Sequence, residues 1–197
     1  MDSAPLQQLS SLLSPAEQQR AHRRNSAVHR NTFISAHAAM RLILAERLQL
    51  QPASIVYTYN AYGKPQLDSH KQIFFNLSHT HAYALLVLSP ACEVGIDIEI
   101  IKPTRDTLAI ARRFFTHNEY NWLCHSGPAQ RDRLFYQLWV YKEACLKASG
   151  EGLQGGLSSL SLEQQDIQQQ TIITDRQHRP WYVQTVEVPE PYLAAFA

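Results

Sequence analysis

The sequence has few cysteines and almost no net charge. Its three cysteines, Cys92, Cys124 and Cys145, are odd in number and form no CxxC pair, so they predict neither a disulfide framework nor a zinc site. The formal net charge of +1 argues against a nucleic-acid or membrane-surface partner. Since there is also no signal peptide at the start and no long apolar run, we expect a cytoplasmic protein.

The composition is that of an ordinary globular protein. Hydrophobic residues make up 45% of the 197 residues and charged residues 18%. This length fits one domain or two small fused halves with a substantial core. Residues 1–41 hold five arginines against two acids, which predicts a local basic surface suited to a small polyanion; the arginines are Arg20, Arg23, Arg24, Arg30 and Arg41.

One acidic stretch, residues 94–100, alternates strictly between two kinds of side chain. Its β-branched residues point one way and Asp97 and Glu99 the other, as in a half-buried β-strand. Two carboxylates at i and i+2 repel each other unless a cation lies between them, and Mg²⁺ prefers such oxygen ligands. The alternative is an edge strand with an exposed acidic face.

Two capping boxes predict where helices begin. The sequence of residues 14–17 predicts a short helix to about Arg24, and residues 116–119 predict one to about Leu123. Hydrophobic periodicity predicts longer helices over residues 28–48 and 131–149, and a further helix over residues 106–115.

Strands are expected in two groups separated by a break at Lys102-Pro103. The first group, residues 55–59, 73–77, 82–88 and 94–100, is spaced like an antiparallel meander. The second comprises residues 157–162, 171–174, 181–188 and 192–196, with a polar loop at 163–170. We therefore predict an α+β fold with an N-terminal half over residues 1–102, including the acidic strand, and a C-terminal half over 103–197.

The second long helix carries an unusual face. Tyr136, Trp139, Glu143 and Lys147 lie at i, i+3, i+7 and i+11, and a plain solvent face would not hold two aromatic residues. We expect this face to be covered. A simple Glu143–Lys147 salt bridge at i and i+4 is the alternative explanation for the two charges.

Two short polar motifs have both structural and functional interpretations. Gly63-Lys64-Pro65 is either a turn with an exposed lysine or a close approach of backbone to a ligand. Ser78-His79-Thr80 either caps a loop after an apolar strand or donates to phosphate oxygens. His37 lies on a core-facing stripe, where a satisfied buried histidine is expected, and Arg30 on a helix face that would otherwise be solvated.

Taken in order, these motifs resemble the Sfp-type 4′-phosphopantetheinyl transferases. The resemblance runs from about Ser14 to Leu153, with a looser fit beyond. It is carried by Gly63-Lys64-Pro65, Phe75-Asn76-Leu77-Ser78-His79-Thr80, Val94-Gly95-Ile96-Asp97-Ile98-Glu99 and Leu138-Trp139-Val140-Tyr141-Lys142-Glu143-Ala144-Cys145-Leu146-Lys147-Ala148.

The resemblance implies two similar α/β halves in one chain, related by a pseudo-two-fold axis, with coenzyme A in the cleft between them. It implies an enzyme that moves the 4′-phosphopantetheine arm of coenzyme A to a serine of an apo acyl or peptidyl carrier protein, with release of 3′,5′-ADP. Such carriers serve fatty acid, polyketide or nonribosomal peptide synthesis. A fused pseudo-dimer of this kind is expected to be a monomer.

The resemblance also implies residue roles. Asp97, Glu99 and Glu143 would hold Mg²⁺, with Mn²⁺ as an alternative, and Lys147 would reach the phosphates. Either Glu143 or a metal-bound water would accept the serine proton.

Coenzyme A itself would be bound by a second set of residues. Lys64, Ser78 and His79 match nucleotide-contacting positions, and Arg30 is a further phosphate contact. The chain departs from many relatives in carrying His37 where they carry arginine.

Two other functions compete with this one. A non-catalytic module that binds a carrier protein or coenzyme A would have a damaged acidic set, whereas Asp97, Glu99 and Glu143 are all present. A Mg²⁺-dependent hydrolase of the coenzyme A pyrophosphate would act without a carrier. If a carrier docks, its acidic helices favour the basic stretch Arg112-Arg113-Phe114-Phe115.

Overall fold

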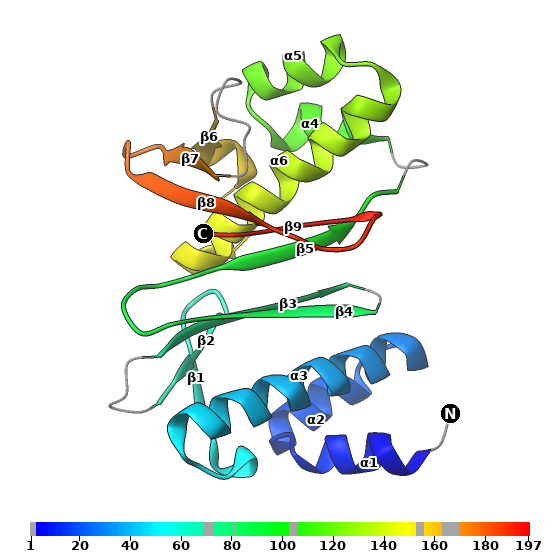
Figure 1. The fold of residues 1–197 in the computed structure, drawn as a ribbon, viewed down its shortest axis with the longest axis vertical. Helices are drawn as coiled ribbons and strands as arrows, with labels where there is room; N and C mark the ends of the chain where they lie inside the picture. The colour runs from blue at the N-terminus through cyan, green and yellow to red at the C-terminus, as the bar shows by residue number, and fades with distance from the viewer. Residues whose placement is uncertain (1–2, 69–72, 81, 103–105, 153–155, 163–169) are drawn as a thin grey trace.

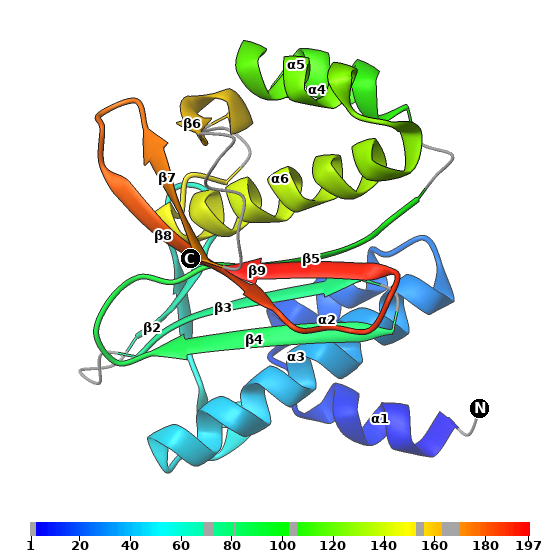
Figure 2. The ribbon, with the colours of Figure 1, turned by 45° about the horizontal axis from the view of Figure 1, so that its top comes forward.

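Two long helices, each of 22 residues, cover two separate sheets. α3 (Ala27–Leu48) lies beneath a β-hairpin, and α6 (Pro128–Ser149) lies above a five-stranded sheet (Figures 1 and 2). The computed structural model describes residues 3–68, 73–80, 82–102, 106–152, 156–162 and 170–197. Helices and strands mix along the chain, which confirms the predicted α+β class.

The N-terminal helices pack on α3. α2 (Pro15–His22) begins at the predicted capping box, in which Ser14 accepts from the Glu17 N–H and the Glu17 carboxylate accepts from the Ser14 N–H. A further helix, α1 (Ser3–Ser11), was not predicted. Its leucines pack against the buried cluster around Phe33.

The sheets comprise two hairpins and one larger antiparallel sheet. The hairpins are β1 (Tyr57–Tyr59) with β2 (Pro65–Leu67), after the 3₁₀ turn η1 (Pro52–Ser54), and β3 (Phe74–Thr80) with β4 (Tyr83–Ser89). The larger sheet has the order β5-β9-β8-β7-β6; its strands are β5 (Ile96–Ile100), β6 (Leu160–Ser161), β7 (Gln170–Asp175), β8 (Pro180–Val186) and β9 (Tyr192–Phe196). The expected loop at 163–170 ends in β7, and its residues 163–169 lie outside the described residues.

The predicted four-strand meander is wrong at its last strand. β5 pairs with β9, from the far end of the chain, and Gly95 and Ala197 exchange both backbone hydrogen bonds beside this ladder. The other edge of β5 approaches β3, where the Ile96 N–H donates to Oδ1 of Asn76 at 2.9 Å. Short spacing predicted pairing between neighbours in the chain, but β9 pairs with one edge of β5, and β3, not β4, lies along the other. The boundary at 102/103 stays a prediction, and β5 joins the C-terminal strands.

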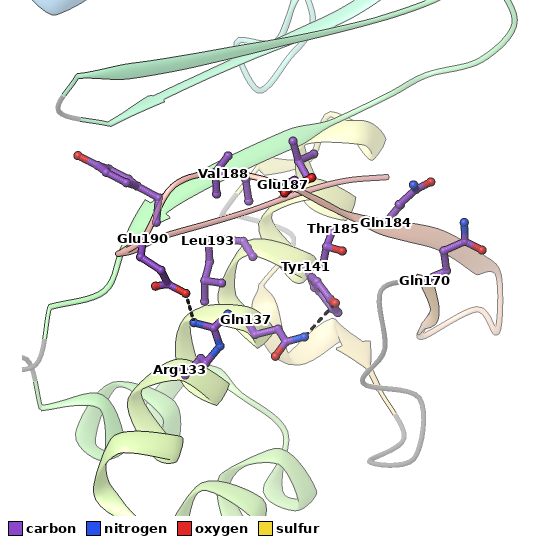
Figure 3. A pocket seen from close by; sticks show the side chains of 14 residues that line it. Arg133, Gln137, Tyr141, Gln170, Gln184, Thr185, Glu187, Val188, Glu190 and Leu193 are labelled. Atoms are coloured by element: carbon purple, nitrogen blue, oxygen red, sulfur yellow. Dashed lines mark hydrogen bonds and ion pairs between the residues drawn. The ribbon is translucent and has the colours of Figure 1, made fainter.

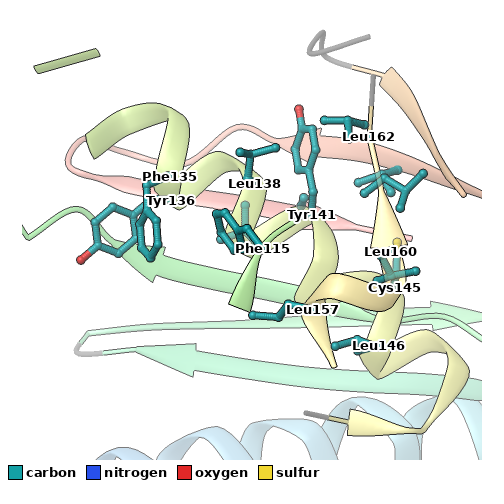
Figure 4. Packing of buried hydrophobic residues seen from close by; sticks show 14 of the residues in the cluster. Phe115, Phe135, Tyr136, Leu138, Tyr141, Cys145, Leu146, Leu157, Leu160 and Leu162 are labelled. Carbon is teal, nitrogen blue, oxygen red and sulfur yellow. The ribbon is translucent and has the colours of Figure 1, made fainter. Parts of the chain in front are cut away.

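The largest core surrounds α6. Phe115, Phe135, Leu138 and Leu146 are among its buried side chains (Figure 4). It lies between the five-stranded sheet and the outer helices α4 (Thr107–Phe114) and α5 (His117–His125), and the 3₁₀ turn η3 (Leu157–Ser159) closes one end. The second face of α6 is covered as expected, because Tyr136 is 1% exposed and Glu143 is 8% exposed.

A buried ion pair connects the first capping box to α3. Arg41 and Glu17 are each 0% exposed, and Nε of Arg41 lies 2.7 Å from Oε2 of Glu17. The Arg41 guanidinium also donates to the carbonyls of Pro52, the first residue of η1, and Ile55, which follows η1. One buried cation therefore fixes α2, α3 and the turn that follows α3.

The same arrangement recurs around α6. Lys142 and Glu119 are both fully buried and form an ion pair, and Glu119 belongs to the second capping box, with Thr116. The Lys142 ammonium also donates to the carbonyls of Leu157 and Leu160, around η3. This recurrence supports the proposal that the chain contains two similar halves.

None of the helices in the described part of the chain has the length and apolarity needed to cross a membrane.

Candidate functional site

Three elements bring polar side chains together at one point. Nζ of Lys147, on α6, lies 2.6 Å from Oδ1 of Asp97, on β5. Ser78, on β3, donates to the same carboxylate oxygen at 3.0 Å and accepts from Lys147 at 2.9 Å. Asp97 is 5% exposed, so the alternative of an exposed acidic edge strand is wrong for this residue.

Gly95 explains how β5 comes so close to α6. A Cβ atom at this position would lie 2.1 Å from the Ala144 carbonyl oxygen and 2.3 Å from the Ala148 nitrogen. Only glycine allows this approach, because both neighbours are helix backbone that cannot move aside. The approach places Asp97, two residues further on, within reach of Lys147.

Glu143 completes the acidic group from one turn earlier on α6. Burial and the nearby Asp97 and Glu99 carboxylates raise its pKa to about 7, against the opposing effect of the Lys147 charge. The predicted acids thus share one electrostatic environment. Among the described residues, Lys147 forms its ion pair with Asp97 and not with Glu143, so the simple helix salt bridge is wrong.

The acidic group has donor oxygens suited to a hard cation. Oδ2 of Asp97 and Oε1 of Glu143 are buried, and neither has a hydrogen-bond partner within the described part of the chain. Buried carboxylate oxygens are stabilised by hydrogen bonds or by a cation, and Mg²⁺ binds such oxygens together with water and substrate phosphates. Within the same residues, no three acidic, histidine or cysteine side chains lie close enough to form a complete metal site.

Ser78 and His79 lie inside β3, so the interpretation of Ser78-His79-Thr80 as a loop is wrong. The pairing with β4 continues through Thr80, which holds Ser78 towards Asp97. Burial lowers the pKa of His79, and the positive charges of His37, Arg24 and Lys147 lower it further. His79 therefore lies within electrostatic reach of both Lys147 and the basic N-terminal helices.

His37 is satisfied within the protein, as expected. Its Nδ1 lies 3.1 Å from Oε1 of Glu17, and its ring stacks on Phe33 at 3.9 Å. Arg30 lies half-buried at the start of α3, and none of the described contacts joins it to the acidic group.

Lys64 does not join the acidic group, but its ammonium reaches a backbone carbonyl beside it. Nζ donates to the Ala148 carbonyl at 2.9 Å and forms an ion pair with Glu93. Its side chain is 7% exposed, so the interpretation as an exposed turn lysine is wrong. The contact between Lys64 and Ala148 was not predicted, because no local feature of the sequence indicates it.

A large cavity lies elsewhere, between α6 and strands β8 and β9 (Figure 3). It measures about 1130 Å³ and is lined by polar side chains such as Gln137, Thr185 and Glu187. Arg133 and Glu190 form an exposed ion pair at its rim. None of the predicted site residues lines this cavity, so the acidic group, and not this cavity, is the candidate site.

The family model and the similar proteins found by comparison are all described as 4′-phosphopantetheinyl transferases. Residues 93–197 match the family described as the 4′-phosphopantetheinyl transferase superfamily. The chain is 36% identical over 151 residues to the 4′-phosphopantetheinyl transferase HetI of Nostoc sp., covering 75% of this chain and 64% of that protein. It is 30% identical over 185 residues to the 4′-phosphopantetheinyl transferase Sfp of Bacillus subtilis, covering 94% of this chain and 81% of that protein.

Some relatives are considerably longer than the part that matches. The alignment covers 61% of a Synechocystis sp. relative and 64% of the Nostoc sp. one, which is less than two thirds of either protein. A further Bacillus subtilis 4′-phosphopantetheinyl transferase is 34% identical over 156 residues, with 68% of its length covered.

Proposed function

Because the chain belongs to the 4′-phosphopantetheinyl transferase superfamily, we propose that it transfers the 4′-phosphopantetheine arm of coenzyme A to a carrier protein. The acceptor is a serine hydroxyl of an apo acyl or peptidyl carrier, and the second product is 3′,5′-ADP. The observation that carries this proposal is the convergence of Ser78, Asp97 and Lys147, from three elements, beside the buried Glu143.

In this reaction the serine oxygen forms a bond to the phosphorus that bears pantetheine. The bond between that phosphorus and the bridging oxygen of the pyrophosphate breaks, and 3′,5′-ADP leaves with that oxygen. The proposed acceptor of the serine proton is the Glu143 carboxylate, with a nearby water as the alternative. Lys147 stabilises the negative charge that builds on the phosphate oxygens.

Asp97, Glu99 and Glu143 would hold Mg²⁺ or Mn²⁺ in this site. The donor set fits, because Asp97 and Glu143 each have a buried oxygen that lacks a hydrogen-bond partner in the described part of the chain. When bound, the metal supplies charge neutralisation and orientation of the pyrophosphate. Substrate phosphates and waters normally complete a Mg²⁺ site, so the protein need not supply every ligand.

The nucleotide of coenzyme A is proposed to lie along β3, towards the N-terminal helices. Ser78 and His79 would contact it, with Arg30 as a further phosphate contact from α3. The positive charges of Arg24 and His37 act on His79, which supports an anionic ligand on this side of the acidic group. The Glu17 carboxylate already engages His37, so we propose no phosphate contact for His37.

The carrier is proposed to dock at the end of α4. Arg112 and Arg113 are exposed there, and the Arg113 guanidinium lies 5.0 Å from the centre of the Phe114 ring, which is 38% exposed. Phe115, which was expected to belong to this surface, is 6% exposed and lies in the core. A basic and aromatic surface suits an acidic carrier helix.

The protein is further proposed to act as a monomer in the cytoplasm. A species larger than one chain in size-exclusion chromatography would contradict the proposed monomer.

Release of 3′,5′-ADP separates the possible functions. We expect it to form from coenzyme A only when an apo carrier and Mg²⁺ are both present, as measured by chromatography of the nucleotides. Release without any carrier would indicate a hydrolase. Binding of coenzyme A without release, with every carrier tested, would indicate a non-catalytic module.

A further inference from the structure

The turn between β1 and β2 is held rigidly by its own hydrogen bonds. Oδ1 of Asn60 accepts from the backbone N–H groups of Tyr62 and Lys64, each at 2.9 Å. The Asn60 N–H donates to the Lys64 carbonyl, and Gly63 closes the turn with a positive φ of 88°. The two side chains that leave this turn, Asn60 and Lys64, therefore have well-defined positions.

Asn60 reaches the residue that ends α6. Its Nδ2 donates to the Gly150 carbonyl at 2.9 Å. Gly150 terminates the helix with φ 76°, and a Cβ atom there would lie 2.6 Å from Nδ2 of Asn60. The positive φ favours glycine at this position, and a Cβ atom there would have to displace the Asn60 amide.

Lys64 joins the same helix end to the strand that carries Asp97. Its ammonium donates to the Ala148 carbonyl at 2.9 Å and to the Val94 carbonyl at 3.2 Å, and it pairs with Glu93. A lysine ammonium has three donors, and these three acceptors use all of them. The C-terminal end of a helix also favours a cation, because its last carbonyls carry partial negative charge.

These contacts lie next to the proposed catalytic residues on both sides. Ala148 follows Lys147 on α6, and Val94 precedes Asp97 by three residues. We propose that Asn60 and Lys64 form a clasp that fixes the end of α6 against the start of β5, so that Lys64 positions Asp97 and Lys147. In this role its ammonium does not bind the nucleotide of coenzyme A.

The kinetic test of the clasp rests on the proposed function, because it measures the rate of transfer to a carrier. Three variants break the clasp from different sides: Lys64→Met, Asn60→Ala and Gly150→Ala. Each should lower kcat for transfer to a carrier by about tenfold or more, because small displacements of catalytic groups have large effects on rate. The dissociation constant for 3′,5′-ADP, measured by calorimetry, should stay within about twofold of the wild-type value.

A ligand role for Lys64 predicts the opposite pattern. If Lys64→Met weakens 3′,5′-ADP binding about tenfold or more while Asn60→Ala and Gly150→Ala bind it normally, the clasp proposal is overturned. Lys102→Met, which changes an exposed lysine between β5 and α4, is the matched control and should leave both constants unchanged. Circular dichroism tests whether each variant is folded. If Lys64→Met folds poorly, Lys64→Arg replaces it in the test; this variant keeps the charge and several donors and should retain part of the wild-type kcat.

Hydrogen exchange tests the clasp without the reaction. In Lys64→Met and Asn60→Ala, the backbone amides of Gly95 and Gly150 should exchange faster, while amides around Phe135 keep their protection. Unchanged exchange at Gly95 and Gly150 would overturn the clasp even if transfer were slowed. Absence of transfer by the wild-type protein, with faster exchange in the variants, would overturn the proposed function and leave the clasp standing.

Discussion

Lys147 and Asp97 form an ion pair, 2.6 Å between Nζ and Oδ1, that joins α6 to β5. The pair neutralises the Asp97 carboxylate and leaves its second oxygen buried without a hydrogen-bond partner in the described residues. Ser78 contacts both partners, so β3 is tied into the same point. The site therefore depends on how three elements from distant parts of the chain are packed.

Removing the Lys147 charge should slow the reaction more than it weakens substrate binding. We expect Lys147→Met to lower kcat by about 10²–10³-fold, the range observed when one group that stabilises transition-state charge is deleted. Lys147→Arg keeps the charge and should retain more activity. Steady-state kinetics with a saturating carrier would measure both, and a normal kcat in Lys147→Met would exclude the proposed role.

Gly95→Ala should separate β5 from α6. The new Cβ would meet the backbone at Ala144 and Ala148, and overpacking of this kind lowers the free energy of unfolding by about 1–3 kcal/mol or more. Urea unfolding measures this loss, and transfer activity should fall with it.

Gly127→Ala is the matched control, because within the described residues a Cβ at Gly127 would meet the Gln130 amide oxygen no closer than 4.0 Å. Equal stability of the two alanine variants would argue against the close packing at Gly95.

Without metal, Glu143→Gln should make the protein more stable at pH 8. Because burial raises the folded-state pKa of Glu143 to about 7, stability falls as pH rises from the unfolded value of 4.5 through 7. Replacing the carboxylate removes this effect, which is on the order of 2 kcal/mol.

Millimolar Mg²⁺ should raise the Tm of the wild type and have little effect on Glu143→Gln. The exposed Glu46→Gln is the control and should respond to Mg²⁺ like the wild type. A Glu143→Gln protein that Mg²⁺ stabilises as strongly as the wild type would contradict the metal assignment.

Acid should destabilise the protein through Glu17. Burial alone would raise its pKa, but hydrogen bonds from His37, Ser14 and Arg41 outweigh it and lower the pKa to about 2, from 4.5. The contribution of Glu17 is complete above about pH 4.5 and is lost as the pH falls towards 2, amounting to roughly 2–3 kcal/mol. Urea unfolding between pH 7 and pH 2.5 should show this loss.

In Glu17→Gln the same pH range should have a smaller effect. The variant should also be less stable at pH 7, because Arg41 is left buried without its partner. An unchanged pH dependence would show that other carboxylates control acid unfolding.

Charge reversal at the end of α4 should weaken carrier recognition. Changing Arg112 and Arg113 to glutamate should raise KM for the carrier by about tenfold, leave kcat at saturation unchanged and reduce the salt dependence. Arg47→Glu, an exposed change on α3, is the control. Transfer that is unaffected at low carrier concentration would place the docking surface elsewhere.

Local features of the sequence predicted most of the helices. The capping boxes at Ser14 and Thr116 fixed two helix starts, and periodicity placed α3 within one residue of its observed start at Ala27. These signals depend on neighbouring residues only. α1 was missed because its apolar residues are buried by packing on α3, which is not a local feature of the sequence.

Long-range relationships could not be predicted in the same way. The pairing of β5 with β9 joins residues about a hundred positions apart, and nothing near Gly95 indicates Ala197 as its partner. Alternation did predict that Asp97 and Glu99 share a face, and helical spacing placed Glu143 and Lys147 together. The contact of Lys64 with Ala148 depends on the packing of one turn against a distant helix end, which no local pattern encodes.

The most direct test of the account is the intact mass of an apo carrier protein after incubation with this protein, coenzyme A and Mg²⁺. We predict a mass increase equal to one phosphopantetheine group, absent when EDTA is added and absent with Asp97→Ala. A carrier mass that does not change, with several acyl and peptidyl carriers and with coenzyme A shown to bind, would contradict the proposed transfer.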